Sequence, residues 1–391
     1  MKKINTLITL IFLLNTFISL GYWSEVPTPT TEDLNKIEVI NGTAFCVGNN
    51  GTLLKSSNLG DTWSAISTGA TGNLTAIKFT NSSNGYFTTS NGKVYKSTNG
   101  GTSWSSKSVH DGGLNTIDFL DNLTGITAGD NGVLYKTLDG GNSWTSLGSQ
   151  SIYAINDLTF INDTLVVAVG PNGSVLYSGD IGESWTYLTT GTNEVLSAIE
   201  KKDNETGVIV GSNGSYTEFN ASDLSVNNIT KLDNNEHWLK DVHVNEKSYG
   251  YNRTVVVGFS SSYYIENNGW KEWDLDSSNN FTGIHYFNDT VGVICGHHGK
   301  IYKTISEGVP HSITKVFKED IKIYPNPVIS SISLDDKFKN SFVSIYSFES
   351  KIVLQKKVVG NKLDVSSLPK GVYFIRSYIK NQIHTGKFIK K

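Results

Sequence analysis

The sequence of 391 residues has little arginine, almost no methionine and only a small net charge. Arginine occurs only as Arg253 and Arg376, so a site that needs several guanidinium groups cannot be assembled. The formal net charge of −3 provides no global field that would draw the protein to nucleic acid or to an anionic membrane. Long apolar runs are absent after residue 21, so we expect no transmembrane segment in the mature chain.

The one long apolar run lies at the N-terminus and predicts a signal peptide over residues 1–21. Lys2 and Lys3 form a positive segment, Leu7 to Leu20 is apolar, and small residues surround a cleavage site before Tyr22. A membrane anchor is the alternative, but the run is short for a bilayer core of about 30 Å. We therefore expect export from the cytosol.

Cysteine is also scarce, since the chain has only Cys46 and Cys295. An even number of cysteines in an exported protein permits a disulfide, here between the first and last repeats. Neighbouring sheets pack about 10 Å apart, however, and a disulfide needs Cα atoms within about 7 Å. We favour two buried free thiols and keep the bridge as the alternative.

Glycine, asparagine, serine and threonine are abundant, and they recur in a repeat. A turn that ends in tryptophan closes each of four segments, at Trp63, Trp104, Trp144 and Trp185, with a period of 40 to 41 residues. Each repeat has short alternating apolar runs and an Asn-Gly pair suited to a type I′ hairpin. Four short strands in about 40 residues indicate one blade of a β-propeller.

Continued over the chain, the same spacing predicts seven blades. The sixth, around residues 239–273, is longer and irregular, and the seventh lacks a fourth strand. Trp23 lies 40 residues before Trp63, so we expect the segment around Trp23 to pair with the blade near residue 300 and close the ring. Closure would remove two open sheet edges.

The tryptophan-ending turns resemble the Asp-box, or bacterial neuraminidase repeat, Ser/Thr-x-Asp-x-Gly-x-Thr/Ser-Trp. Thr137 to Trp144 and Ser178 to Trp185 fit this pattern, while Asn99 and Asn58 replace the aspartate in two other copies. As a whole, residues 22–305 resemble the seven-bladed propellers related to the photosystem II assembly and stability factor. The resemblance implies the fold, and the scarcity of arginine argues against carrying over a photosystem role.

The composition of the chain changes near residue 315. Beyond it there is no tryptophan, and lysine becomes frequent. Residues 321–391 resemble the type A C-terminal sorting domain of the type IX secretion system of Bacteroidota. The resemblance rests on Tyr324-Pro325-Asn326-Pro327, on the segment that contains Gly371 and Tyr373, and on a basic end that begins at Lys387. It implies a partner, the type IX secretion machinery, and delivery to the medium or the cell surface.

Two kinds of catalytic site were weighed against a purely structural role. A sialidase, which clamps its substrate's carboxylate with three arginines, is excluded because only Arg253 lies in the propeller. Asp157 and Asp241 share one position in their first strands, and Asp118 lies two residues further along its own. Such carboxylates could form the acid–base pair of a glycoside hydrolase. Bonding within their blades is the alternative that we favour.

Ligand-binding candidates come from the irregular sixth unit and from the seventh hairpin. Trp270, Trp273 and Tyr263 could stack on a sugar or a partner protein, with packing between blades as the alternative. His297 and His298 replace the residues of a hairpin tip, where histidine also tolerates left-handed backbone. We assign no metal site and no cofactor.

The sequence thus predicts an all-β protein with a signal peptide (1–21), a seven-bladed propeller (22–310), a linker (311–320) and a small β-sandwich sorting domain (321–391). We expect a secreted or surface-displayed, non-catalytic scaffold that binds a protein or a polysaccharide through loops of residues 215–240 and 245–275. The alternative function is a carbohydrate-active hydrolase.

Overall fold

The computed structural model describes residues 23–232, 237–246, 252–266, 269–273, 275, 278–305, 321–339, 341–347, 352–379 and 382–391. The expected signal peptide and linker lie outside these residues. The described chain is all-β and divides into two compact units, residues 1–310 and 311–391. No helix among the described residues has the length and hydropathy of a membrane span.

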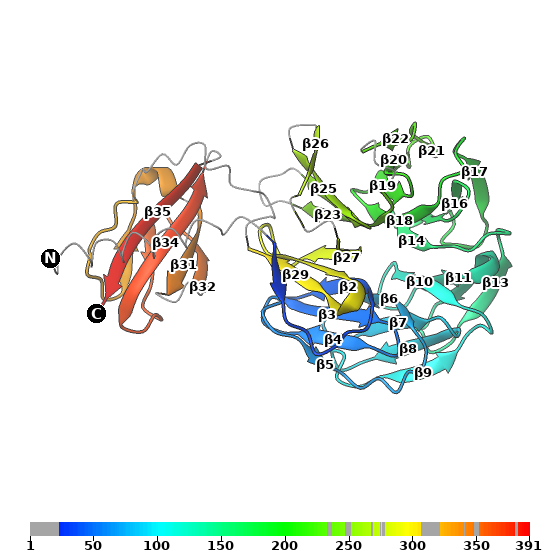
Figure 1. Ribbon diagram of the computed structural model, residues 1–391, viewed down its shortest axis with the longest axis horizontal. Helices are drawn as coiled ribbons and strands as arrows, with labels where there is room; N and C mark the ends of the chain where they lie inside the picture. Colours follow the sequence, from blue (N-terminus) through cyan, green and yellow to red (C-terminus); the bar gives the residue numbers. More distant parts are fainter. Residues whose placement is uncertain are drawn as a thin grey trace. The chain divides into compact units, whose positions relative to one another are not determined.

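The first unit is a propeller, and its described residues form seven antiparallel sheets (Figure 1). The first two sheets contain β2 (Leu34–Ile40), β3 (Thr43–Gly48), β4 (Leu53–Ser56), β5 (Ser64–Ala65), β6 (Leu74–Phe79), β7 (Gly85–Thr89), β8 (Lys93–Ser97) and β9 (Ser105–Ser108). The next two contain β10 (Leu114–Phe119), β11 (Gly125–Gly129), β12 (Val133–Thr137), β13 (Thr145–Ser149), β14 (Asp157–Phe160), β15 (Val166–Val169), β16 (Ser174–Ser178) and β17 (Thr186–Thr189).

The remaining three sheets complete the ring. They contain β18 (Leu196–Lys201), β19 (Thr206–Gly211), β20 (Ser215–Asn220), β21 (Ser225–Val226), β22 (Thr230–Lys231), β23 (Leu239–Glu246), β24 (Asn252–Gly258), β25 (Ser261–Glu266), β26 (Gly269–Glu272), β27 (Phe281–Tyr286), β28 (Gly292–Gly296), β29 (Ile301–Thr304) and β1 (Ser24–Val26). Two 3₁₀ turns occupy hairpin tips, η1 (Asp130–Gly132) and η2 (His297–Gly299).

The first and last strands of the propeller lie in one sheet. Strand β1 pairs antiparallel with β29, with Glu25 opposite Tyr302. Just before β1, Trp23 is buried and packs edge-on against Trp273, with 5.0 Å between ring centroids, and against Tyr286 at 6.1 Å. The pairing gives β29 a hydrogen-bonded neighbour on the side that the seventh repeat leaves open.

The tryptophan-ending turns share one hydrogen-bonding pattern. Oδ1 of Asp139 accepts the hydroxyl of Thr137 at 2.9 Å and the backbone N–H of Ser143 at 2.8 Å. Asn99 makes the equivalent contacts with Ser97 and Ser103. Hydrogen bonds from the Ser143 hydroxyl and backbone hold the pKa of Asp139 down, at about 2. The side chain therefore caps its own turn, whether it is aspartate or asparagine.

Both cysteines are buried and free, and they meet at the junction of the first and last sheets. Burial, together with a hydrogen bond that the Cys46 thiol donates to Cys295, raises the pKa of Cys46 well above its usual value. The two neutral thiols thus belong to the hydrophobic core between these sheets.

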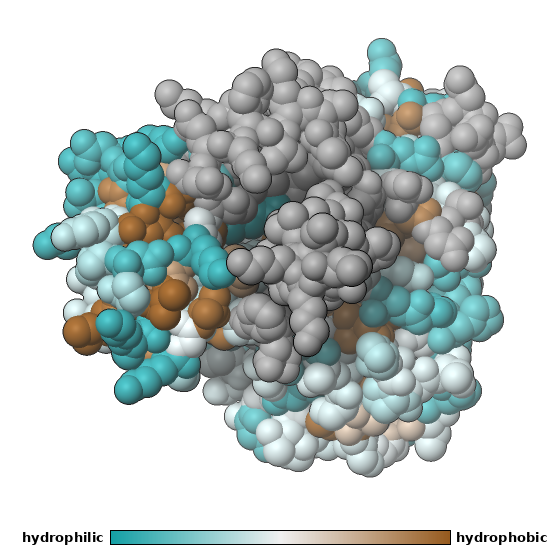
Figure 2. All heavy atoms as spheres, turned by 60° about the vertical axis from the view of Figure 1, so that its left-hand side comes forward, coloured by the Kyte–Doolittle hydropathy of each residue, from teal (hydrophilic) through white to brown (hydrophobic). Residues whose placement is uncertain are grey.

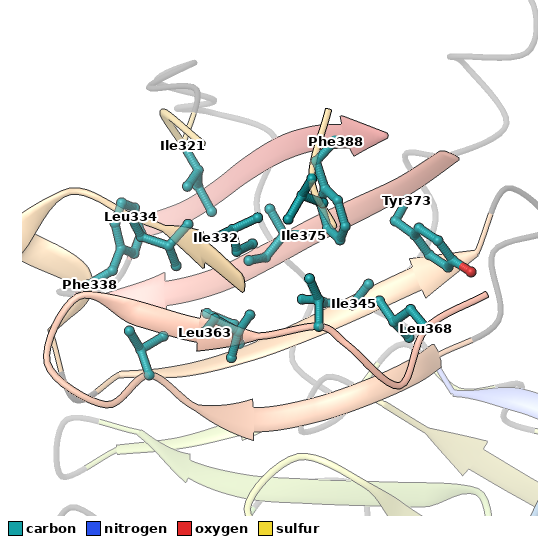
Figure 3. Packing of buried hydrophobic residues seen from close by; sticks show 14 residues of the cluster. Ile321, Ile332, Leu334, Phe338, Ile345, Leu363, Leu368, Tyr373, Ile375 and Phe388 are labelled. Atoms are coloured by element: carbon teal, nitrogen blue, oxygen red, sulfur yellow. The ribbon is translucent and has the colours of Figure 1, made fainter. Parts of the chain in front are cut away.

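The second unit has two sheets around one core (Figure 3). Its elements are β30 (Ser331–Ser333), η4 (Asp336–Phe338), β31 (Phe342–Ser347), β32 (Ile352–Lys357), β33 (Lys362–Asp364), β34 (Gly371–Ile379) and β35 (Gln382–Lys390). The pair β30–β33 contributes Ile332 and Leu363 to this core, and the four-strand sheet β32-β31-β34-β35 contributes Ile345, Ile375 and Phe388.

Tryptophan exposure singles out one position. The structure describes all eight tryptophans of the chain, and Trp238 is the most exposed of them, at 38%. On the face displayed in Figure 2, hydrophobic residues form separate brown areas among hydrophilic ones. Trp238 directly precedes β23, the first strand of the sixth sheet.

Candidate functional site

A cavity of about 270 Å³ lies where the first strands of the seven sheets begin. Each sheet contributes the residue that follows a buried Leu, Ile or Phe in its first strand or just before it. These seven residues, which we call the mouth ring, are Asn35, Thr75, Asn115, Asn156, Ser197, Lys240 and Thr282. A single position of the repeat therefore supplies seven of the twelve residues that line this cavity.

Most of the mouth ring ties neighbouring sheets together. Five of its side chains donate a hydrogen bond of 2.6 to 3.1 Å to a backbone carbonyl of the next sheet. The donors are Asn35, Thr75, Asn115, Asn156 and Thr282. The side chains of Ser197 and Lys240 make no such bond among the described residues, so the ring is interrupted at two adjacent sheets.

At this interruption Lys240 lies among aromatic rings. Its Nζ is 4.2 Å from the centroid of Trp238 and 5.2 Å from that of Phe259. The indole N–H of Trp238 donates to Oγ of Ser197 at 2.7 Å, which fixes the ring. Burial lowers the pKa of Lys240, and no carboxylate in the described part of the chain forms an ion pair with it. The cation is held by ring faces alone.

One residue further along the strands, the axis holds a partly buried ion triad. Nζ of Lys36 lies 2.7 Å from Oδ1 of Asp241 and 3.6 Å from Oδ2 of Asp157. The other oxygen of Asp241 accepts the backbone N–H of Ile284 at 2.9 Å, and Oδ1 of Asp157 accepts the hydroxyl of Thr116 at 2.8 Å. Burial raises the pKa of Asp241 against the opposing effect of Lys36.

Further along the same strands a second ring, the charged ring, adjoins a cavity of about 320 Å³ at the other end of the axis. Its members are Glu38, Lys78, Asp118, Thr159, Glu200, His243 and His285. Asp118 is 3.1 Å from Lys78 Nζ and accepts the backbone N–H of Phe160. His243 Nδ1 is 3.1 Å from Glu200, and the rings of His243 and His285 are 4.2 Å apart.

In the charged ring, burial shifts the pKa values of Glu38 and His285 in opposite directions. Burial raises the pKa of Glu38 from 4.5 to about 7, although Lys78 opposes the shift. Burial, and then the neighbouring His243, lower the pKa of His285 well below 6.5. The two groups face each other, with His285 Nε2 3.8 Å from Oε2 of Glu38. At pH 7 Glu38 is therefore about half protonated, whereas His285 favours its neutral form.

The shifted pKa values of Glu38 and His285 have opposite effects on how the free energy of unfolding changes with pH. The raised pKa of Glu38 stabilises the fold fully below pH 4.5, and this contribution is lost as the pH rises to about 7. The lowered pKa of His285 acts in the other direction, because its contribution is present above pH 6.5 and is lost as the pH falls. Between these limits the two slopes partly cancel.

Replacing Glu38 with glutamine should remove the contribution of Glu38 to the pH dependence of stability and leave that of His285. Relative to the native chain, Glu38→Gln should gain about 3 kcal/mol in free energy of unfolding between pH 4.5 and 7, because glutamine never ionises. Urea unfolding over that pH range measures the gain. The exposed Glu205→Gln is the control and should run parallel to the native protein, and a parallel course for Glu38→Gln as well would disprove the raised pKa.

The ligand-binding candidates from the irregular unit lie mainly in the core. Tyr263 and Trp273 are each 3% exposed, and Trp273 packs against Trp23. Trp270 is half-buried and meets the ring of Tyr216 at 4.9 Å. Their burial favours packing between sheets over stacking on a ligand.

The two histidines of the seventh hairpin have separate roles. His298 is exposed and left-handed, with φ of 57°, and its backbone N–H donates to Asp33 at 2.9 Å. His297 lines the mouth cavity, with its ring 5.2 Å from that of Phe259. Of the predicted ligand residues, only His297 therefore reaches the mouth cavity, where Lys240 and Phe259 join it.

The described residues offer no ready metal site. Within the part of the chain that the structure describes, no group of three or more His, Cys, Asp or Glu side chains is arranged to hold a metal ion.

In the second unit the predicted sorting motif is docked on the last strand. The amide of Asn326 donates to the carbonyl of Lys387 at 3.0 Å and accepts the N–H of Ile389 at 2.9 Å. Val328, just after Pro327, forms a parallel bridge with Lys390. At the start of the motif the backbone of Tyr324 pairs with Ser333, while Tyr324 itself is 77% exposed.

The other motif residues support the same strand. Gly371 begins β34 opposite Lys390, and the buried Tyr373 stacks on Phe388 with 5.6 Å between centroids. The hydroxyl of Tyr373 donates to the carbonyl of Pro369 at 2.9 Å. The start, middle and end of the predicted motif therefore meet along β34 and β35.

Two family models match parts of the chain. Residues 322–391 match the secretion system C-terminal sorting domain, and residues 13–114 match the photosynthesis system II assembly factor YCF48. No curated protein matches the chain.

Solved structures share the propeller fold at low sequence identity. "YCF48 bound to D1 peptide" is 18% identical with a TM-score of 0.60, over 73% of this chain and 95% of the other. YCF48 from Cyanidioschyzon merolae has the same identity and TM-score, over 72% and 98%. An ancestral GH74 enzyme, AFV00434, is 14% identical with a TM-score of 0.59, over 94% of this chain and 63% of that one. The chain thus joins a propeller to a region that matches a secretion sorting domain.

Proposed function

We propose that this chain is an exported, non-catalytic binding scaffold, whose propeller holds a polysaccharide or a protein at the mouth cavity. The observation that carries the proposal is the interruption of the mouth ring at Ser197 and Lys240. Elsewhere the repeat uses this position to join sheets, so the departure here leaves the ammonium group of Lys240 available to a ligand. Binding sites on rigid repeat frames commonly arise in this way.

The axial carboxylates support binding over catalysis. Asp157 and Asp241 share the ammonium group of Lys36, and Asp118 is held by Lys78 and a backbone N–H. A glycosidase needs one protonated and one ionised carboxyl group facing its substrate across a gap. Here the charge of Lys36 fills the space between the two aspartates.

The second unit supports delivery to the outside of the cell. Its match to a secretion sorting domain, together with the expected signal peptide at residues 1–21, suits a protein that crosses two membranes. We propose the type IX secretion machinery as its partner, and release into the medium or display on the cell surface as its destination.

The alternative function is a glycoside hydrolase. It is favoured by the propeller fold that this chain shares with a GH74 enzyme. The two readings differ in what happens to a bound polysaccharide. A scaffold leaves the chain length unchanged, whereas a hydrolase releases shorter sugars.

A combined binding and hydrolysis screen separates these functions. The protein without residues 1–21 should retain one or more polysaccharides or peptides on an immobilised array and release no reducing sugar. Heat-denatured protein is the control for non-specific retention. The non-catalytic proposal would be overturned if the native protein released reducing sugar and Asp157→Asn or Asp241→Asn abolished that release.

A further inference from the structure

We propose that the mouth cavity binds a carboxylated sugar, such as the uronic acid at the end of an acidic polysaccharide, with the ammonium group of Lys240 taking the carboxylate. The proposal rests on the binding function proposed above and names the chemistry of its ligand. It is argued from charge, from hydrogen-bonding capacity and from the aromatic rim.

The charge of Lys240 is not balanced within the cavity. The other lysine there, Lys36, is engaged by Asp157 and Asp241. Asp157 is itself held by Thr116 and by the backbone N–H of Leu158, so it is not a partner for Lys240. Partial burial of a cation without a counter-charge is unfavourable, and an anion from outside would offset that cost.

Several polar groups of the mouth ring can act as acceptors. Asn35, Asn115 and Asn156 each use the amide nitrogen to donate to the next sheet, which leaves the amide oxygen to accept. Sugar hydroxyl groups supply donors for several acceptors at once. A sugar unit offers hydroxyl donors on adjacent carbons, whereas a peptide offers one backbone N–H per residue, so a sugar suits neighbouring acceptors better.

The rim of the cavity is aromatic. Trp238 is 38% exposed beside Lys240, and the rings of Phe259 and His297 meet at 5.2 Å. Apolar ring faces with a few placed polar groups are the usual lining of small-ligand sites. The volume of about 270 Å³ suits one or two sugar units, so the site fits the end of a chain.

Titration calorimetry with tetragalacturonate tests the proposal on the protein without residues 1–21. Binding should weaken by roughly 10- to 100-fold when the carboxylates are methyl-esterified, because the charged contact is lost. Lys240→Met should cause a similar loss, while Lys240→Arg should retain most of the affinity. The control is Lys201→Met, because Lys201 lines the cavity at the other end of the axis. This substitution should leave the affinity for tetragalacturonate unchanged.

The outcomes separate this inference from the proposed function. If Lys240→Met unfolds at the same temperature as the native protein or at a higher one, its loss of binding is not caused by a loss of fold. Equal binding of the ester and the acid, or full binding by Lys240→Met, would overturn the inference. Binding of a neutral sugar or a peptide, with no binding of tetragalacturonate, would overturn it too and leave the scaffold function standing. Cleavage of tetragalacturonate would contradict the scaffold function itself.

Discussion

Replacing Trp23 with alanine should lower the free energy of unfolding of the propeller by about 4 kcal/mol. Truncation of a buried tryptophan typically costs about 3–5 kcal/mol, because the cavity left behind is only partly refilled. The side chain of Trp23 is 8% exposed and packs edge-on against Trp273 and Tyr286. The loss also weakens the pairing of β1 with β29, which closes the ring.

Urea unfolding followed by tryptophan fluorescence and by circular dichroism measures this effect. Tyr187→Ala is the control, because Tyr187 is an aromatic residue exposed at 48% on strand β17 and truncation there should change the stability by less than about 1 kcal/mol. If both variants unfold at the same urea concentration as the native protein, the N-terminal segment does not close the last sheet in solution.

Lys36→Met should also destabilise the protein by about 4 kcal/mol. Removing one partner of a buried ion pair leaves an uncompensated charge and typically costs about 3–5 kcal/mol. Here the substitution leaves two carboxylates near the axis, on Asp157 and Asp241, whose side chains are 14% and 3% exposed. Their mutual repulsion adds to the cost of desolvation.

The triple variant Lys36→Met, Asp157→Asn, Asp241→Asn should recover most of the lost stability, since no charge then remains in the triad. Thermal and urea unfolding of the single and triple variants measure the recovery, and the exposed Lys201→Met serves as the control for loss of a lysine. A single variant as stable as the native protein would show that the triad is well solvated. The axial aspartates would then return as candidates for catalysis.

The repeat explains why so much of the fold could be read from the sequence. Turns that end in Trp104 or Trp144 carry their own hydrogen bonds, so local pattern and local structure coincide. The distance from Trp23 to Trp63 placed the first strand beside β29, where the structure has it. His298 occupies a left-handed tip, as its place in the repeat indicates.

The candidate site was harder to predict, because its partners are distant in sequence. Lys36 and Asp241 are 205 residues apart, and no local pattern joins them. The aromatic content of the sixth unit indicated stacking residues, but tertiary packing buries Tyr263 and Trp273 in the core. Lys240 was missed although a signal existed, since it occupies a position where the other units have Asn, Thr or Ser.

The pairing of β1 with β29 also determines when the ring can close as the chain is synthesised. Ser24 and Lys303, whose strands pair, are 279 residues apart, and a chain grows at about 5–20 residues per second. Roughly 15 to 55 s must therefore pass between the appearance of β1 and that of its partner. Throughout this interval the other six sheets can form in order while Trp23 has no core to enter. Strand β1 therefore has no partner until β29 has been made, so closure of the ring is the last pairing that the propeller can complete.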